Sequence, residues 1–284
     1  MSPEVSGFVY VADEEQGLFL CAQPGCVVAR PTRSPPWIVV DHKLESVIVS
    51  RWPGKLWKVT VLDAVTDQDV VVAGAGRLVP DAGYTRAVSV QVLEELAPAV
   101  LFGPAGVAVC RILESISRLD YEQATALSTR VNLAATVLYS KAWNCWLRGI
   151  APNSYHLDQE HDHVLAIPTQ RGAPQSPINQ GFLIIHSQLH KRAVLVSGTA
   201  ALQSRRDCAQ ESHEDDAAGY SDDDDDGTWL EPTWSRAADA LLYAAMATGA
   251  REFLTEEEQR VLGAAWTGVF GGLSTESSEA SKDT

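Results

Sequence analysis

In the first eighty residues, short apolar runs alternate with turn-forming residues, which is typical of a β-rich region. Apolar and polar positions alternate most clearly over residues 56–61, as expected of a half-buried strand. Prolines and glycines separate the runs. We therefore predict that residues 1–100 form a curved antiparallel sheet or small barrel. Its strands are expected over residues 7–12, 17–21, 26–30, 37–40, 46–51 and 55–62. Residues 86–96 fit a strand or a helix, and we favour a strand that runs into a turn.

After position 104 the apolar spacing changes to three and four residues, which indicates helices. One helix is predicted over 105–117. A longer one is expected to begin at Asp120, where Gln123 completes a capping box, and to end near position 149. Residues 151–180 have the composition of a loop with a short strand over 163–168. Residues 181–186 and 192–197 are predicted to pair as a β-hairpin.

The C-terminal part contains two further helices by the same criteria. The first covers 237–248 and ends at Gly249, and the second opens at a capping box of Thr255 and Glu258 and runs to position 270. The predicted fold class is α+β: a β-rich region, a helical region, a hairpin and two C-terminal helices. We divide the chain into 1–100, 101–203, 204–232, 233–273 and 274–284, or alternatively treat it as one compact domain. Of these segments, 204–232 and 274–284 are expected to be disordered.

The composition is that of a soluble globular protein, with 45% hydrophobic and 21% charged residues. A net charge of −15 argues against a general nucleic-acid binder, which needs clustered Lys and Arg. The five cysteines are scattered and odd in number, so we expect a reducing cytoplasm, with Cys110 acting as a small hydrophobic residue. There is no secretory signal and no apolar run of about 18 residues, so no membrane span is expected. Arg outnumbers Lys, as in GC-rich bacterial genomes.

A cluster of histidines and carboxylates occupies residues 156–163. On a strand, His161 and His163 would share one face, and two imidazoles at that spacing can bind one metal ion. A bound metal could activate water for hydrolysis of an ester, amide or phosphate. The metal ligands of this hypothesis are His156, Asp158, His161, His163 and His186, and its cofactor is zinc or another divalent ion.

The alternative is a solvated loop without a metal or any other cofactor, because the order of these residues matches no metal fingerprint. His186 and His190 would share a helical face, but the hairpin prediction separates them. No Gly-x-Ser-x-Gly elbow occurs. The pair Gly74 and Gly76 follows a strand-like segment at 69–73 but lacks the third glycine of a dinucleotide fingerprint. The sequence therefore carries no nucleotide-binding signature, and whether the protein is an enzyme stays open, with binding favoured.

A basic and aromatic patch precedes and enters one predicted strand, and its residues are Arg51, Trp52, Lys55, Trp57 and Lys58. Basic residues interleaved with Trp can bind single-stranded nucleic acid, which makes a nucleic-acid-associated factor the third hypothesis. The alternative places Trp57 in the core and the lysines in water, and we favour it.

Acidic residues concentrate in the segment predicted to be disordered. Such a run is usually a solvated linker, but it can also dock on a basic partner. We therefore expect a non-catalytic, acidic intracellular protein that neutralises or regulates a basic protein, as an antidote or an inhibitor does. The partner-binding residues of this hypothesis are Glu211, Glu214, Asp215, Asp216, Asp222, Asp223, Asp224, Asp225 and Asp226.

Overall fold

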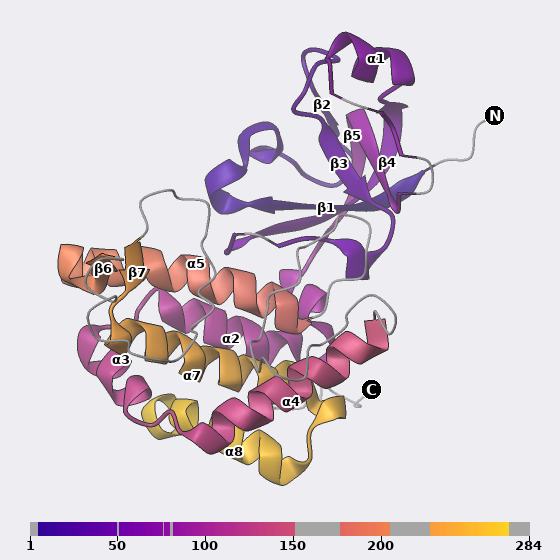
Figure 1. Ribbon diagram of the computed structural model, residues 1–284. Helices are drawn as coiled ribbons and strands as arrows, with labels where there is room; N and C mark the ends of the chain where they lie inside the picture. Colours follow the sequence, from indigo (N-terminus) through magenta and orange to yellow (C-terminus); the bar gives the residue numbers. More distant parts are fainter. Residues whose placement is uncertain are drawn as a thin grey trace, which may run out of the picture. The chain divides into compact units, whose positions relative to one another are not determined.

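The computed structural model describes residues 5–49, 51–75, 77–79, 82–150, 177–204 and 228–272. The chain forms two compact units. The first comprises Met1–Gly106 and Leu165–Gln188, and the second comprises Val107–Val164 and Leu189–Thr284. An antiparallel sheet dominates the first unit and helices dominate the second (Figure 1). The fold is α+β, as predicted.

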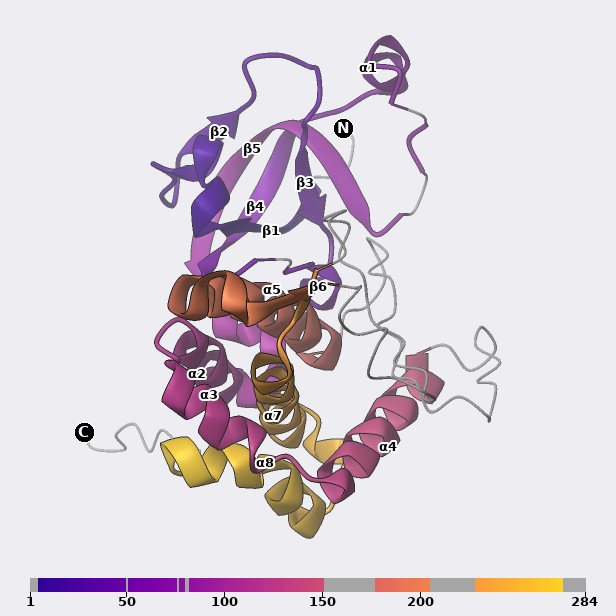
Figure 2. The same cartoon turned by 60° about the vertical axis from the view of Figure 1, so that its left-hand side comes forward.

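The sheet of the first unit closes into a small barrel. Its five strands follow the order β2-β5-β3-β1-β4, and β4 also pairs with β5. This additional pairing joins β5, β3, β1 and β4 into a four-strand ring, and β2 extends the sheet at β5 (Figure 2). The strands are β1 (Ser6–Ala12), β2 (Val27–Ala29), β3 (Ile38–Asp41), β4 (Gly54–Ala64) and β5 (Tyr84–Leu96).

Two long strands supply the curvature of the ring. Strands β4 and β5 contain 11 and 13 residues and pair with register shifts at Lys58/Val59, Val61/Asp63 and Asp63/Ala64. Such irregularities bend a strand and increase its twist, which a narrow closed barrel requires. The predicted strand over 86–96 is confirmed, and it is the strand that β2, β3 and β4 all contact.

The barrel core is formed by the inward-facing positions of every strand. Trp57 and Val59 on β4 are buried and Lys58 between them is exposed, but Leu56 and Thr60 are buried as well, so the alternation predicted over residues 56–61 holds only from Trp57 to Val59. Phe19, from a segment outside the strands, also contributes to the core. The buried members are Val9, Phe19, Val28, Ile38, Val40, Trp57, Val59, Ala87, Val90 and Val92.

Gly7 allows β1 and β3 to approach each other closely. A Cβ atom at this position would lie 2.3 Å from the carbonyl oxygen of Asp41 and 2.8 Å from a methyl group of Val40. Because a backbone carbonyl cannot move aside cheaply, we predict that Gly7→Ala lowers the free energy of unfolding by about 1–3 kcal/mol. Chemical denaturation of the two proteins measures this difference.

Gly263 on α8 (Glu256–Phe270) provides a control, because the same substitution there is expected to raise the free energy of unfolding. No atom lies within 4 Å of a Cβ built there. Alanine is a better helix former than glycine, so Gly263→Ala should stabilise by about 0.5–1 kcal/mol. Equal effects of the two substitutions would contradict the close approach of β1 and β3.

Two of the predicted strands are wrong. Residues 17–21 contain a 3₁₀ helix, η2 (Gly17–Phe19), which begins at a glycine with φ of +33°. Residues 46–51 follow a second one, η3 (Leu44–Ser46), and the amide of Val47 donates to the carbonyl of Leu44. In both segments the apolar side chains suggested a strand, but the amides of Leu20 and Val47 donate to carbonyls three residues earlier in the chain.

The strand-like segment 69–73 also proves to be helical, as part of α1 (Asp67–Val72). Thr66 and Asp69 form a capping box at its start, which sequence inspection overlooked. The guanidinium of Arg33 donates to Asp69 at 2.8 Å and to Asp63 at 2.5 Å, so it ties α1 to β4. This pairing and the capping hydrogen bonds hold the pKa of Asp69 below its usual range.

The second unit consists of α-helices whose N-termini are largely marked in the sequence. The capping boxes at Asp120 and Thr255 are both present, as predicted. The predicted helix from 120 to 149 is interrupted, however, because the side chain of Asn132 accepts a hydrogen bond from the amide of Ala135 and caps a new helix. The helices are α2 (Gly106–Ile116), α3 (Tyr121–Ser128), α4 (Leu133–Ile150), α7 (Pro232–Gly249) and α8.

The hairpin predicted over 181–197 is wrong, because these residues belong to one helix, α5 (Pro177–Ser197). Its buried residues Ile185, Leu189 and Ala193 recur every four positions, which is a helical period. Residues 187–191 contain no Gly, Pro, Asn or Asp that would favour a hairpin turn. The β-branched residues of this segment therefore gave a misleading signal.

Helix α7 is the central helix of the second unit. It packs against α3, α4 and α8, and side chains all around it are buried, from Trp234 to Thr248. A helix that is apolar on every side belongs in the middle of a bundle. The predicted end of this helix at Gly249 is confirmed, and its start lies at Pro232, the favoured position for proline.

One helical stretch, Pro98–Ile116, is long and apolar enough to meet the length and hydropathy criteria for a membrane span. It is not one continuous α-helix. Residues 98–105 form the 3₁₀ segment η4, with non-helical φ and ψ at Phe102 and Gly103. Helix α2 alone has 11 residues, about 17 Å, against a hydrocarbon core of about 30 Å. Its apolar residues Ile112, Leu113 and Ile116 are buried inside the protein.

Candidate functional site: a groove in the barrel

The three sites predicted from the sequence are described by the structure to different extents. Of the proposed metal ligands, only His186 lies within the described residues, half-buried on α5, and the other four lie outside them. His186 and His190 are one turn apart on this helix, in contrast to the separation that the hairpin implied. In the part of the chain that the structure describes, no three His, Cys, Asp or Glu side chains gather closely enough to hold a metal ion. The metal hypothesis stays a prediction.

The predicted acidic partner-binding residues also lie outside the described residues, but both flanks of their segment are described. Strand β6 (Leu202–Ser204) pairs antiparallel with β7 (Thr228–Leu230), and Ser204 is the register partner of Thr228. The amide of Glu231 donates to the carbonyl of Ala201 at 2.8 Å and extends the pairing. The acidic segment, residues 205–227, therefore starts and ends at adjacent points of one ladder.

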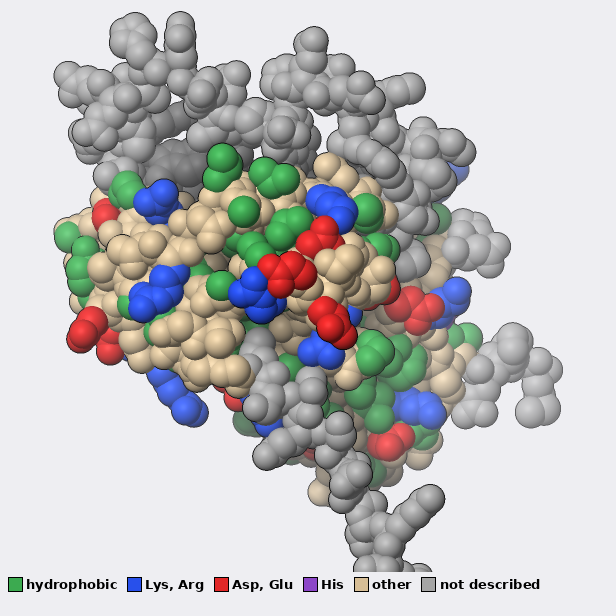
Figure 3. Space-filling view, turned by 90° about the horizontal axis from the view of Figure 1, so that it is seen from below, with side chains coloured by type: hydrophobic (Ala, Val, Ile, Leu, Met, Phe, Trp, Pro, Cys, Tyr) green, Lys and Arg blue, Asp and Glu red, His purple; other side chains and the backbone are tan. Residues whose placement is uncertain are grey.

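The acidity of the chain is concentrated in that segment. Residues 205–227 contain ten acidic and two basic side chains, a net charge of −8 out of −15. The described residues contain 19 acidic and 18 basic side chains. On one face of the molecule, the acidic and basic side chains are interspersed (Figure 3). The described surface is therefore nearly neutral, in contrast to the whole chain.

The basic residues of the aromatic patch have acidic neighbours. Arg51 lies 2.9 Å from Glu15, and Lys55 lies 3.6 Å from Glu95 on the neighbouring strand. Lys58 is in register with Glu94. This arrangement leaves little uncompensated positive charge for a nucleic-acid backbone.

The two tryptophans of the patch lie in apolar surroundings. Trp57 is buried in the barrel core, and the half-buried ring of Trp52 contacts Phe102 edge-to-face at 5.5 Å. Neither ring is presented as a stacking platform for bases. The geometry thus supports the core interpretation and gives the nucleic-acid hypothesis no support.

Among the described residues, a groove of about 370 Å³ lies in the barrel unit, and we call it the barrel groove. Strands β1 and β3 are joined by a single residue pair, Phe8 with Asp41. Beyond this pair the two strands diverge (Figure 2). Residues of both strands line the groove. The lining residues used below are Tyr10, Glu15, Leu18, Arg30, Trp37, Val39 and Asp41.

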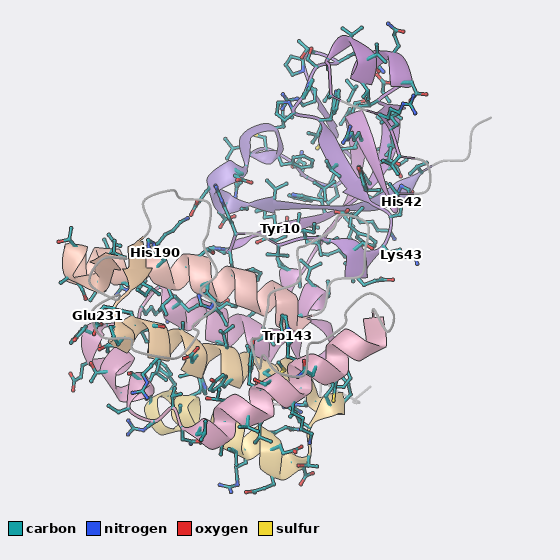
Figure 4. The ribbon with its side chains drawn as sticks, viewed as in Figure 1. Tyr10, His42, Lys43, Trp143, His190 and Glu231 are labelled. Carbon is teal, nitrogen blue, oxygen red and sulfur yellow. The ribbon has the colours of Figure 1, made fainter. Side chains whose placement is uncertain are left out.

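The floor of the groove is apolar. Val9 and Ile38, from the two diverging strands, and Phe19, from η2, are buried and belong to the barrel core. Tyr10 lies on β1 (Figure 4), and its hydroxyl donates to the carbonyl of Arg51 at 2.8 Å. An apolar floor with a few fixed polar groups is the usual composition of a binding site.

Arginine and tryptophan side chains meet at one part of the groove. The Nε–H of Arg30 is buried and has no hydrogen-bond partner among the residues that the structure describes. Trp37 is fixed by its indole N–H, which donates to the carbonyl of Arg33 at 2.7 Å, and by Arg86, whose guanidinium lies 5.3 Å from its ring centre. The lining of the groove thus includes a buried donor, at Arg30, and a fixed aromatic ring, at Trp37.

Acidic side chains lie at the groove as well. Asp41 is almost fully buried, and Glu15 belongs to η1 (Asp13–Glu15), a run of three carboxylates. Arg51 is the cation that pairs with this run, at Glu14 and Glu15. The groove and the adjacent η1 together therefore carry more negative than positive charge.

Sequence inspection did not single out Arg30, Trp37 or Asp41 as site residues. They lie at the end of β2, just before β3 and at the end of β3, and the pairing of β2 and β3 with β5 brings these segments to one side of the barrel. No short motif links them, so the sequence offers no local signal for this site.

The cysteines show no sign of redox chemistry in the described part of the chain, where Cys21, Cys26, Cys110 and Cys145 are free thiols. Burial in α2 raises the pKa of Cys110 to about 12, so its thiol remains protonated near neutral pH. This agrees with its expected role as a small hydrophobic residue.

One carboxyl group of the second unit is unusual in its electrostatics. Burial raises the pKa of Asp239 on α7 from 3.8 to about 6, partly opposed by Arg236. Burial also raises the pKa of Tyr139, to which Tyr243 and then Asp239 contribute, and the rings of Tyr139 and Tyr243 lie 5.1 Å apart. The hydroxyl of Tyr243 donates to Thr136 at 3.0 Å.

The raised pKa of Asp239 predicts that Asp239→Asn changes the stability of the fold by an amount that depends on pH. The folded protein disfavours the charged form, so the stabilisation contributed by protonated Asp239 is complete below about pH 4 and lost as the pH rises through 6. The neutral variant should be more stable than the parent by about 1–3 kcal/mol at pH 8 and equally stable at pH 4. Urea unfolding at both pH values measures this. The exposed Glu122→Gln should change stability by less than about 0.5 kcal/mol at either pH.

Comparison with known proteins adds nothing to this geometry. No protein-family model, curated protein or solved structure matches the chain.

Proposed function

We propose that the protein is a non-catalytic binding protein that neutralises or regulates a basic protein partner. The observation that carries this proposal is the distribution of charge. More than half of the net −15 lies in residues 205–227, while the described remainder is almost balanced. A localised negative charge attracts a basic partner over a distance and raises the rate of association.

The β6–β7 ladder supports this role, because it fixes both ends of the acidic segment at one place on the second unit. The segment thus has a defined point of attachment, whatever conformation it takes on a partner. At such a site, charge contributes more to specificity and to the rate of association than to affinity.

The test compares two triple variants with the same net charge. Asp222, Asp224 and Asp226 are replaced by Asn in the first, and the exposed Glu94, Glu122 and Glu252 by Gln in the second. The probe is the fraction of a cell lysate that binds a cation exchanger at pH 7, passed over the immobilised full chain at low salt. A retained protein is identified, purified and used for stopped-flow association.

We expect the parent to associate about tenfold or more faster at 20 mM than at 300 mM salt. The Asp variant, which removes three of the ten carboxylates of the segment, should lose a measurable part of this salt dependence, and the Glu variant should retain it. Equal rates for both variants, or failure of the parent to retain any basic protein stoichiometrically, would refute the proposal.

A further inference from the structure

Two arginines at the barrel groove have no carboxylate partner among the residues that the structure describes. Arg30 lines the groove, and its side chain makes no ion pair or hydrogen bond there. Arg86 on β5 contacts the ring of Trp37 with its guanidinium and likewise pairs with no carboxylate in the described part of the chain. Arg33 shows the contrast, because two carboxylates hold its guanidinium. The positive charges of Arg30 and Arg86 are therefore not compensated by the fold.

The sheet places these two arginines close together. The amide of Arg30 donates to the carbonyl of Val88 at 2.8 Å, and Arg86 precedes Val88 by two residues on β5. Diagonal neighbours on adjacent strands lie about 7–8 Å apart. Two positive charges are thus concentrated at the end of the groove where β2 ends and β3 begins.

Part of each guanidinium is buried and part is accessible. The Nε of Arg30 and one terminal nitrogen of Arg86 are buried without a hydrogen-bond partner among the described residues. The other nitrogens of both side chains also have no partner there, but they are not buried. A ligand can therefore reach the terminal nitrogens of Arg30 and not its Nε. Withdrawing a charge from water without a partner is costly, and a bound anion would offset that cost.

The carboxylates of the groove do not compensate these arginines. Glu15 pairs with Arg51, whose guanidinium lies 2.9 Å away. Asp41 is almost fully buried at the far end of β3, four residues from Trp37, which corresponds to about 13 Å along an extended strand. The end of the groove beside Trp37 is therefore positive, although the groove and η1 as a whole carry more negative charge.

The remainder of the groove suits an apolar group. Val9, Phe19 and Ile38 form a buried apolar floor, and the ring of Trp37 is held in place by its indole hydrogen bond. The volume of about 370 Å³ is in the range of small-molecule sites, about 300–1,000 Å³. The planar guanidinium of Arg30 matches the two oxygens of one carboxylate. Together these features fit an apolar molecule with a single carboxylate.

We infer that the barrel groove binds a small carboxylic acid in its ionised form. The carboxylate accepts hydrogen bonds from the terminal nitrogens of Arg30, and the apolar body lies on the floor beside Trp37. Arg86 does not line the groove and contributes positive charge from its position at the ring of Trp37. This site goes beyond the proposed function, because it gives the first unit a small-molecule ligand of its own.

The probe is phenylacetate, which combines an apolar ring with one carboxylate. Phenylacetamide has the same body without the charge, acetate has the charge without the body, and inorganic phosphate is an anion of different geometry. Binding to the full chain is followed in a low-chloride buffer by the NMR signals of the Trp37 indole N–H and the Arg30 Nε–H. We expect saturable shifts with phenylacetate and binding at least about tenfold weaker for the other three compounds.

Substitutions of Arg30 test the contact with the carboxylate. Arg30→Gln removes the charge, and Arg30→Lys retains it. Arg118→Gln makes the same change at an exposed arginine of the second unit. Arg30→Gln should weaken phenylacetate about tenfold or more, Arg30→Lys should weaken it by a smaller factor, and Arg118→Gln should change affinity less than about twofold.

A second pair of variants keeps the test independent of whether Arg30→Gln folds. Leu18 lines the groove at a partly exposed position, so Leu18→Asp adds a negative charge to the site with little loss of buried surface. Leu133→Asp adds the same charge at an exposed position of α4. Leu18→Asp should weaken phenylacetate about tenfold, and Leu133→Asp should leave its affinity unchanged. The amide spectrum of each variant reports whether the barrel is intact.

The inference is wrong if phenylacetate causes no saturable shift, or if phenylacetamide binds equally well. It is also wrong if Arg30→Gln and Leu18→Asp bind as the parent does. Equal binding of acetate or phosphate would show an adventitious anion contact in place of a site for an apolar carboxylate. The triple Asn variant should bind phenylacetate with unchanged affinity, so failure of the groove inference and failure of the proposed function are observed separately.

Discussion

Replacement of Trp57 by Ala is expected to lower the free energy of unfolding of the barrel unit by about 3–5 kcal/mol. The ring is 1% exposed and packs with Val9, Val59 and Val92 in the barrel core. Removing it leaves a cavity among strands that the closed ring holds in place, so collapse around the cavity is restricted. Denaturant titration followed by amide signals of β4 and β5 reports on this unit separately.

A second substitution at the same position distinguishes lost packing from other effects. The indole N–H of Trp57 is buried without a hydrogen-bond partner among the described residues, and phenylalanine removes this polar group while keeping an aromatic ring. Trp57→Phe should therefore cost only about 1–2 kcal/mol. If Trp57→Ala changed stability by less than 1 kcal/mol, the ring would not be a core residue.

Leu241→Ala should destabilise the helical unit by about 2–5 kcal/mol. Leu241 is fully buried on α7, the helix that contacts α3, α4 and α8, so its removal affects several helix interfaces. The effect should appear in the amide signals of α7 and α8 during a denaturant titration.

The control for this substitution is Leu133→Ala at the start of α4. Leu133 is 79% exposed, and its truncation should change stability by less than about 0.5 kcal/mol. Similar losses at positions 133 and 241 would contradict the central placement of α7.

The elements that the sequence predicted correctly are those with local signals. Capping boxes at Asp120 and Thr255 depend on residues three apart, and both are present. The alternation predicted for β4 is correct only from Trp57 to Val59, because Leu56 and Thr60 on the other face are buried as well. Helix α5 was missed because β-branched residues outweighed a four-residue period, and the break before α4 was missed because Asn132 was not recognised as a cap.

The barrel groove and the neutralised basic patch depend on contacts distant in sequence. Lys55 meets Glu95 only because β4 pairs with β5, and Trp37 joins Arg86 only because β3 pairs with β5. The order and register of strands decide these contacts, and neither is encoded in a short segment. The net charge of the whole chain also did not indicate that the described surface is nearly neutral, because it sums segments whose net charges differ greatly.

Because Ser204 is the register partner of Thr228, the segment between them can change in length without changing the fold around it. The chain leaves the β6–β7 ladder and returns to it at neighbouring positions, so the helices on either side do not depend on what lies between. Doubling such a connection costs only about 0.6 kcal/mol in closure entropy. Homologous chains could therefore lengthen, shorten or recharge the insert with little effect on folding, and a reporter domain could be grafted there.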